Sequence, residues 1–193
     1  YISCFLTSGQ VCMALKRLYV PRPLFGDVVD GLGAVMNNQL VGNGLKDGVT
    51  MGPLTTPQQK RTVETMLEEA KAAGQDIRHY GAIDNEAEFA EGRFLRPSLV
   101  VNADPDLSVV RDEQFGPTLP VIAYDSEDEA VAMANDSDYG LSSSVWSDDP
   151  ARAVKLARRL EAALRAHFGD GFVLLSVRPA REPNPSQPES PAR

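Results

Sequence analysis

The residues of this sequence that most clearly could carry out chemistry are residues 8–14, which read Ser-Gly-Gln-Val-Cys-Met-Ala. A Gly-Gln turn leading into small residues predicts that Cys12 lies at or near the N-terminus of a helix. Unpaired N–H groups and the helix dipole at such a position favour thiolate over thiol and can stabilise an oxyanion. Cys12 is therefore a candidate nucleophile, and the alternative is that it is a small buried hydrophobic residue. For Cys4 only that second interpretation applies.

Other combinations of reactive residues carry weaker signals. The histidines His79 and His167 are far apart and isolated, and two cysteines are too few for a zinc site with four ligands, so no metal site is predicted. A thiol hydrolase would need one of these histidines beside the cysteine, and neither lies in a recognisable motif. Residues 42–48 contain three glycines, but the neighbouring sequence favours a turn over a phosphate-binding loop.

The elements that must position these residues alternate along the chain. Strands are predicted over residues 16–21, 77–80, 94–101, 119–124 and 142–146, and helices over residues 23–36, 57–74, 126–135 and 149–161. Such alternation favours an α/β fold in layers, with a mainly parallel sheet flanked by helices.

The composition indicates which class of protein this is and which partners are not expected. Of the 193 residues, 42% are hydrophobic and 24% charged, which is typical of a globular domain. Lys and Arg number 19 against 27 for Asp and Glu, a net charge of -8 that argues against a nucleic-acid partner. No apolar run approaches the roughly 20 residues of a transmembrane helix, so we expect no membrane partner. The low cysteine content leads us to expect the reducing environment of the cytoplasm.

The character of the sequence changes towards its end. Residues 178–193 are rich in Pro, Ser, Glu and Arg, and they contain almost nothing to bury, which predicts a disordered tail. We therefore divide the chain into one α/β domain over residues 1–162 and a divergent segment over residues 163–193. Because the first residue is Tyr1 rather than Met, we expect the sequence to be an excerpt of a longer one.

Four motifs, taken in order, resemble those of the NAD(P)-dependent aldehyde dehydrogenase superfamily. Residues 5–16 read Phe-x-x-x-Gly-Gln-x-Cys-Met-Ala-x-Lys, which is similar to the catalytic-cysteine signature of that family. Residues 113–117 read Glu-Gln-Phe-Gly-Pro and resemble its cofactor motif. A third match covers residues 134–142, and a weaker fourth covers residues 52–59. The resemblance implies an incomplete aldehyde dehydrogenase catalytic domain.

The resemblance also implies a role for each candidate site residue. Cys12 would add to an aldehyde, hydride would leave for a nicotinamide, and the resulting thioester would be hydrolysed to a carboxylic acid. Glu113 would hold the hydroxyls of the nicotinamide ribose, which suits an acceptor-only carboxylate. Phe115 would lie against the nicotinamide, and Gln59, or Gln58 if the register shifts by one, would contact the ribose. The implied cofactor is NAD or NADP, the substrate a small-molecule aldehyde, and the intact protein a homo-oligomer.

We also expect Cys12 and residues 113–115 to line one cleft at the carboxyl edge of the parallel sheet, where open α/β sheets bind ligands. Four departures from the family pattern qualify the implied activity. The family's dinucleotide-binding half and its general-base glutamate lie upstream of the nucleophile, whereas the first glutamate here is Glu64. Thr7 stands where many relatives carry Asn, and after Ala162 the sequence leaves the family pattern, as a shifted reading frame or a truncated product would. We therefore expect a fragment that is inactive alone, and the alternative is a non-catalytic remnant that acts as a packing or interaction module.

Overall fold

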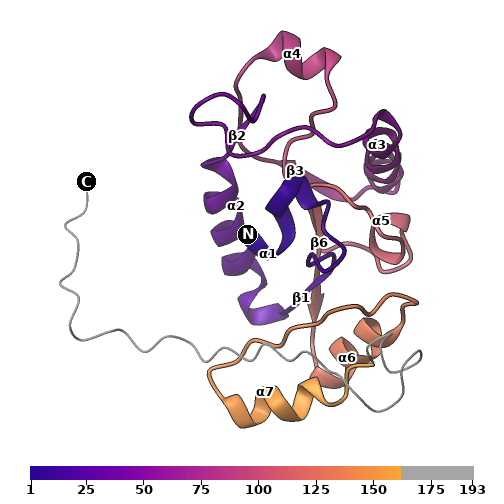
Figure 1. Ribbon diagram of the computed structural model, residues 1–193. Helices are drawn as coiled ribbons and strands as arrows, with labels where there is room; N and C mark the ends of the chain where they lie inside the picture. The colour runs from indigo at the N-terminus through magenta and orange to yellow at the C-terminus, as the bar shows by residue number, and fades with distance from the viewer. Residues whose placement is uncertain (162–193) are drawn as a thin grey trace, which may run out of the picture.

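Strands and helices alternate along residues 1–161, the part of the chain that this computed structural model describes (Figure 1). The strands are β1 (Leu18–Pro21), β2 (Leu40–Val41), β3 (Asp76–His79), β4 (Ala82–Ile83), β5 (Ser98–Val101) and β6 (Thr118–Tyr124). The helices are α1 (Ile2–Phe5), α2 (Phe25–Asn37), α3 (Pro57–Ala72), α4 (Glu86–Glu91), α5 (Ser108–Arg111), α6 (Glu127–Asn135) and α7 (Pro150–Ala157), with 3-10 turns η1 (Leu6–Gly9) and η2 (Arg22–Leu24). The segment expected to diverge, residues 163–193, lies outside the described residues.

The main sheet has the strand order β1-β6-β5-β3. Strand β6 pairs in parallel with both β1 and β5, whereas β3 pairs with β5 in the antiparallel direction. A small second sheet pairs β2 with β4 in parallel. The predicted α/β fold with a mainly parallel sheet is therefore confirmed.

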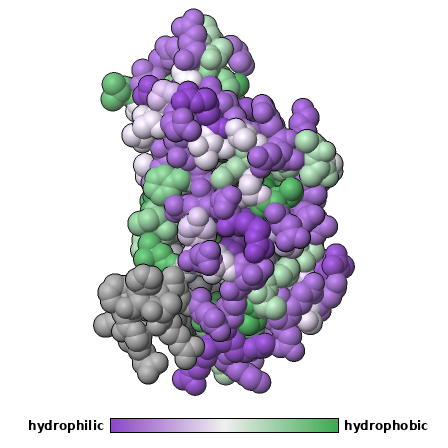
Figure 2. All heavy atoms as spheres, turned by 90° about the vertical axis from the view of Figure 1, so that its right-hand side faces the viewer, coloured by the Kyte–Doolittle hydropathy of each residue, from purple (hydrophilic) through white to green (hydrophobic). Residues whose placement is uncertain are grey.

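Helices cover both faces of this sheet, which is why its central strands are buried on both sides. Successive residues of a strand point to opposite faces. Leu119 of β6 packs with α2 residues such as Met36 in one core, whereas Ile122 packs with Ala70 of α3 and with α5 in the other. The outer surface on the α3 and α5 side is largely hydrophilic (Figure 2).

The helix starts follow the capping residues of the sequence. The side chains of Thr56, Ser126 and Asp149 accept hydrogen bonds from backbone N–H groups in the first turns of α3, α6 and α7. Pro57 occupies the first position of α3, where its missing N–H costs nothing, and Gly74 follows the helix at a φ of 80°. These boundaries agree with the predictions.

Three predictions differ from the structure by more than two residues. Residues 142–146, predicted as a strand, pair with no strand of residues 1–161. An alternating pattern of residues does not make a strand unless another backbone pairs with it. Strand β5 begins at Ser98 rather than at residue 94, because Pro97 has no N–H to donate to a ladder. Helix α7 ends at Ala157, before its predicted end at residue 161. Among the described residues, no helix has the length and apolar character needed to cross a membrane.

Candidate active site

Cys12 lies in an exposed turn before β1, not at the N-terminus of a helix. The N–H of Ala14 donates to the carbonyl of Val11 at 2.9 Å and closes this turn. The predicted helix is wrong because residues 7–9 are left-handed and Gly9 packs on Gly116, which leads the chain into this turn and on to β1 at Leu18. The helix dipole therefore gives no reason for thiolate formation here, and the reactivity of Cys12 depends on its exposure.

Cys4 has the opposite surroundings. Its side chain is 2% exposed and packs in the core with Phe5 and Val20. Burial raises the pKa of the Cys4 thiol from its ordinary value of 9.0 to about 12, with smaller opposing effects from Lys16 and the N-terminal ammonium. Cys4 is therefore a core residue that stays protonated at neutral pH.

The segment that carries Cys12, residues 7–14, is called the cysteine loop below. It begins with three consecutive residues in the left-handed region: Thr7 at a φ of 53°, Ser8 at 55° and Gly9 at 75°. Hydrogen bonds to the weaker fourth motif hold this conformation. The Ser8 hydroxyl donates to the Gly52 carbonyl at 2.8 Å, and the Gln10 side-chain oxygen accepts from the Thr55 N–H at 2.8 Å.

The cysteine loop packs directly against residues 113–117, called the cofactor loop below. A Cβ added to Gly9 would lie 2.1 Å from the carbonyl oxygen of Gly116, and a Cβ added to Gly116 would lie 2.5 Å from a methyl carbon of Val63 in α3. Neither backbone could approach so closely with a side chain present. The first two family-like motifs therefore meet through glycine backbones.

Both loops lie at the amino ends of the parallel strands. The cysteine loop precedes β1 and the cofactor loop precedes β6, and these strands pair in parallel with Leu18 opposite Val121. The expectation of a site at the carboxyl edge is therefore wrong. The physical reason is chain order: residues placed before parallel strands meet at the amino edge.

The three residues expected to bind cofactor lie on or beside the cofactor loop. Glu113 is exposed, and Phe115 is half-buried with a φ of 49°, again in the left-handed region. The Gln59 side chain donates to the carbonyl of Gln114 at 2.6 Å, which ties α3 to the cofactor loop. Its neighbour Gln58 is exposed and accepts a hydrogen bond from Arg61 at 2.8 Å, so Gln59 is the one of the two that is hydrogen-bonded to the cofactor loop.

Two polar residues of the site were missed in the sequence. Lys16 donates from its ammonium to the carbonyl oxygens of Gly9 at 2.6 Å and Gly116 at 3.1 Å. Gln114 is fully buried, and its side-chain amide donates to the carbonyl of Val109. Gln114 gave no signal, because a glutamine inside a loop motif reads as exposed. Lys16 did offer one: it stands inside the cysteine motif next to a second cation, Arg17.

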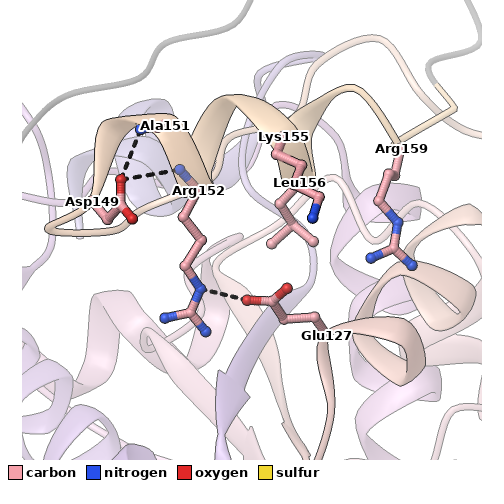
Figure 3. A pocket seen from close by; sticks show the side chains of 7 residues that line it. All are labelled: Glu127, Asp149, Ala151, Arg152, Lys155, Leu156 and Arg159. Carbon is pink, nitrogen blue, oxygen red and sulfur yellow. Dashed lines mark hydrogen bonds and ion pairs between the residues drawn. The ribbon is translucent and has the colours of Figure 1, made fainter.

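A separate hollow lies between α6 and α7 (Figure 3). It is lined by Glu127, Asp149, Ala151, Arg152, Lys155, Leu156 and Arg159. Arg152 pairs with Glu127 at 2.5 Å, and Asp149 accepts two hydrogen bonds from the backbone at the start of α7. Arg152 thus joins the two helices and Asp149 caps α7, and the hollow contains none of the candidate site residues.

Comparison with known proteins identifies a family and several relatives of this chain. Residues 2–166 match the model of the aldehyde dehydrogenase family. The chain is 32% identical over 160 residues to geranial dehydrogenase of Castellaniella defragrans, covering 83% of this chain and 33% of that protein. It is 35% identical over 163 residues to the mitochondrial succinate-semialdehyde dehydrogenase of Rattus norvegicus, covering 84% and 30%.

Solved structures agree with the sequence relatives. The NAD+ complex of an aldehyde dehydrogenase from Bacillus cereus superposes with a TM-score of 0.76 at 29% identity, covering 84% of this chain and 32% of that one. Betaine aldehyde dehydrogenase from Staphylococcus aureus in complex with NAD+ gives 0.75 at 29% identity, covering 83% and 32%. The chain thus spans about a third of the length of these relatives.

Proposed function

This chain belongs to the aldehyde dehydrogenase family, and we propose that it supplies the nucleophile and the nicotinamide end of the cofactor site to an enzyme that oxidises an aldehyde to a carboxylic acid. The observation that carries this proposal is the direct contact between the cysteine loop and the cofactor loop at Gly9 and Gly116. Relatives named for geranial and for succinate semialdehyde support an aldehyde as the substrate class.

Cys12 is the proposed nucleophile because its side chain is exposed in a turn that the rest of the loop holds in place. After the thiol has lost its proton to solvent, its sulfur forms a bond to the carbonyl carbon of the aldehyde, and the π electron pair moves to the oxygen. Within residues 1–161 the N–H of Cys12 donates no hydrogen bond, so it is free to stabilise that oxyanion. Cys4, buried and protonated, is excluded from this role.

The residues present fit the nicotinamide end of NAD or NADP. Glu113 is exposed and forms no ion pair among the described residues, so its two oxygens can accept hydrogen bonds from two ribose hydroxyls. The half-buried ring of Phe115 offers an apolar surface beside it, and Gln59 fixes the backbone between them through Gln114. When bound, the nicotinamide supplies the hydride acceptor. Relatives solved with NAD+ support this assignment.

Acylation by an activated ester tests the nucleophile without aldehyde or cofactor. We expect p-nitrophenyl acetate to release one equivalent of nitrophenolate and to leave an acetyl group on Cys12, located by peptide mass spectrometry. Cys12→Ser should abolish the burst, and the matched variant Cys4→Ser should retain it. A burst that survives Cys12→Ser would contradict the nucleophile assignment and favour the alternative of a non-catalytic packing module.

A further inference from the structure

Lys16 is the one lysine of the described residues whose ammonium bridges the two loops of the candidate site. Its Nζ donates to the carbonyl oxygen of Gly9 at 2.6 Å and to that of Gly116 at 3.1 Å. These oxygens belong to the same pair of glycines whose backbones are in close contact. Two carbonyl dipoles thus point at one cation, whose positive charge offsets the repulsion between them.

The surroundings of Lys16 differ from those of a surface lysine. Burial lowers the pKa of its ammonium, and the nearby Cys4 and Glu113 partly oppose this shift. The ammonium has only three N–H donors, and two are directed at loop carbonyls. The remaining side-chain ties of the cysteine loop to other segments run elsewhere, from Ser8 to Gly52, from the Thr55 N–H to Gln10 and from Ser142 to the Met13 carbonyl. Among the side-chain hydrogen bonds of the described residues, Lys16 alone joins the cysteine loop to the cofactor loop.

We propose that Lys16 is a positioning residue of this site, which holds Cys12 in register with Glu113 and Phe115 by clamping Gly9 to Gly116. The sequence separations are short: Gly9 precedes Cys12 by three residues, and Gly116 directly follows Phe115. A shift of either carbonyl therefore moves a proposed reacting or cofactor-binding group. Lys16 itself touches none of the reacting atoms. Its meaning for catalysis rests on the proposed function, but the clamp is a physical property of the unliganded chain.

Hydrogen–deuterium exchange on the full chain tests the clamp. We expect Lys16→Met, which keeps an unbranched side chain one atom shorter and removes the donors, to accelerate amide exchange at least 5-fold in residues 8–15 and 113–119. Exchange in α3 should stay unchanged, and Lys16→Arg should keep at least half of the protection. The rate at which Cys12 reacts with iodoacetamide should also change at least 3-fold in Lys16→Met, because a displaced turn alters the surroundings of the thiol.

Lys60→Met is the matched control. Lys60 is also half-buried and donates from its ammonium to a glycine carbonyl, that of Gly92 at 3.0 Å, but away from the two loops. This variant should leave exchange in both loops and the labelling of Cys12 unchanged. Any of three results would overturn the proposal. In the first, amide exchange in both loops of Lys16→Met equals that of the wild type. In the second or third, Lys60→Met or Lys16→Arg accelerates exchange in the loops as much as Lys16→Met does.

A measurement on the unmodified chain covers the case in which Lys16→Met does not fold. Nuclear Overhauser effects from the ε-methylene and ammonium protons of Lys16 to the α protons of Gly9 and Gly116 report the clamp directly. We expect contacts to both glycines, and contacts to one glycine or to none would overturn it. None of these readouts needs an aldehyde or NAD, so their failure is distinct from a failure of Cys12 acylation.

Discussion

Gly9 and Gly116 lie so close that a Cβ on the first would stand 2.1 Å from the carbonyl oxygen of the second. The contact joins two segments that are far apart in the chain and that precede neighbouring parallel strands. Gly9 also has a φ of 75°, which only glycine adopts without strain. Both the space and the conformation at Gly9 therefore exclude a side chain.

Gly9→Ala should consequently destabilise the chain by roughly 2–5 kcal/mol, the combined cost of a left-handed alanine and of overpacking. Urea denaturation measures this loss. Gly31→Ala is the control, because Gly31 lies inside α2 and a Cβ added there would have nothing within 4 Å. That control should stabilise the chain by about 0.5–1 kcal/mol. Equal midpoints for the two variants would contradict the close contact.

Cys12 should react with iodoacetamide on the order of 100-fold faster than Cys4 in the folded chain. The reason is burial: Cys4 is 2% exposed and its pKa is raised to about 12, whereas Cys12 is exposed. Peptide mapping after brief alkylation measures the two rates. In concentrated urea the difference should disappear, and a comparable rate for both thiols under native conditions would count against the placement of Cys4.

Thr7→Asn should stabilise the chain by about 0.5–1 kcal/mol. Thr7 is exposed and has a φ of 53°, a conformation that is strained for a β-branched side chain and tolerated by Asn. The hydrogen bonds at this position use the Thr7 carbonyl, which the substitution retains. Thr55→Asn, at a residue outside the left-handed region, should shift the urea midpoint little. A midpoint that falls in Thr7→Asn would disprove the strain argument.

The stability that Cys4 contributes should fall at high pH. Because the folded-state pKa of about 12 lies above the ordinary value of 9.0, the folded chain holds the thiol proton more tightly than the unfolded chain. That contribution is complete below pH 9.0 and is lost as the pH rises towards about 12. Between about pH 8 and about pH 10.5 the free-energy difference between wild type and Cys4→Ala should shrink by roughly 2 kcal/mol.

Denaturant titrations of both proteins at the two pH values test this sign. Other groups titrate in the same range, but they are common to wild type and variant and cancel in the difference. Val20→Ala, a change at another buried residue of the same core, should carry a penalty that does not depend on pH. A difference for Cys4→Ala that stays constant with pH would show that the thiol is less buried than in this structure.

The chain alone should be acylated at Cys12 without producing NADH at ordinary enzyme rates. It spans about a third of its relatives, and the proposed contacts of Glu113 and Phe115 reach only the nicotinamide end of the cofactor. Cofactor positioning can supply roughly 7–11 kcal/mol of barrier reduction. Absorbance at saturating aldehyde and NAD or NADP measures turnover, and steady turnover would show that this chain holds the whole cofactor site.

The sequence predicts best where the determinants are local. The capping residues Thr56, Ser126 and Asp149 mark helix starts because each cap needs only its own first turn. The cysteine loop and the cofactor loop meet at Gly9 and Gly116, since both precede strands of one sheet. Because both motifs precede their strands, the chain order also indicates that the site lies at the amino edge of the sheet. The prediction of the carboxyl edge followed instead from the general rule for ligand binding in open α/β sheets.

The failures of prediction have non-local causes. Residues 142–146 have the alternation of a strand, but a strand exists only when another backbone pairs with it. The turn at Cys12 follows from left-handed residues at positions 7–9 and from the packing of Gly9 on Gly116, and neither can be read from local helix propensity. The bridge formed by Lys16 depends on two carbonyls from distant segments and was therefore not predicted.

The pairing of β1 with β6 sets the time at which the site can form during synthesis. Among the described residues β1 has β6 as its only partner strand, so the cysteine loop cannot meet the cofactor loop in its final place until Tyr124 has left the ribosome. At about 5–20 residues per second, that wait lasts several seconds or more. Throughout it, the thiol of Cys4 lacks the cover that Leu119 and Val121 of β6 give it in the folded core. The nascent chain therefore passes through a period of chemical vulnerability that ends only when the last strand of the sheet arrives.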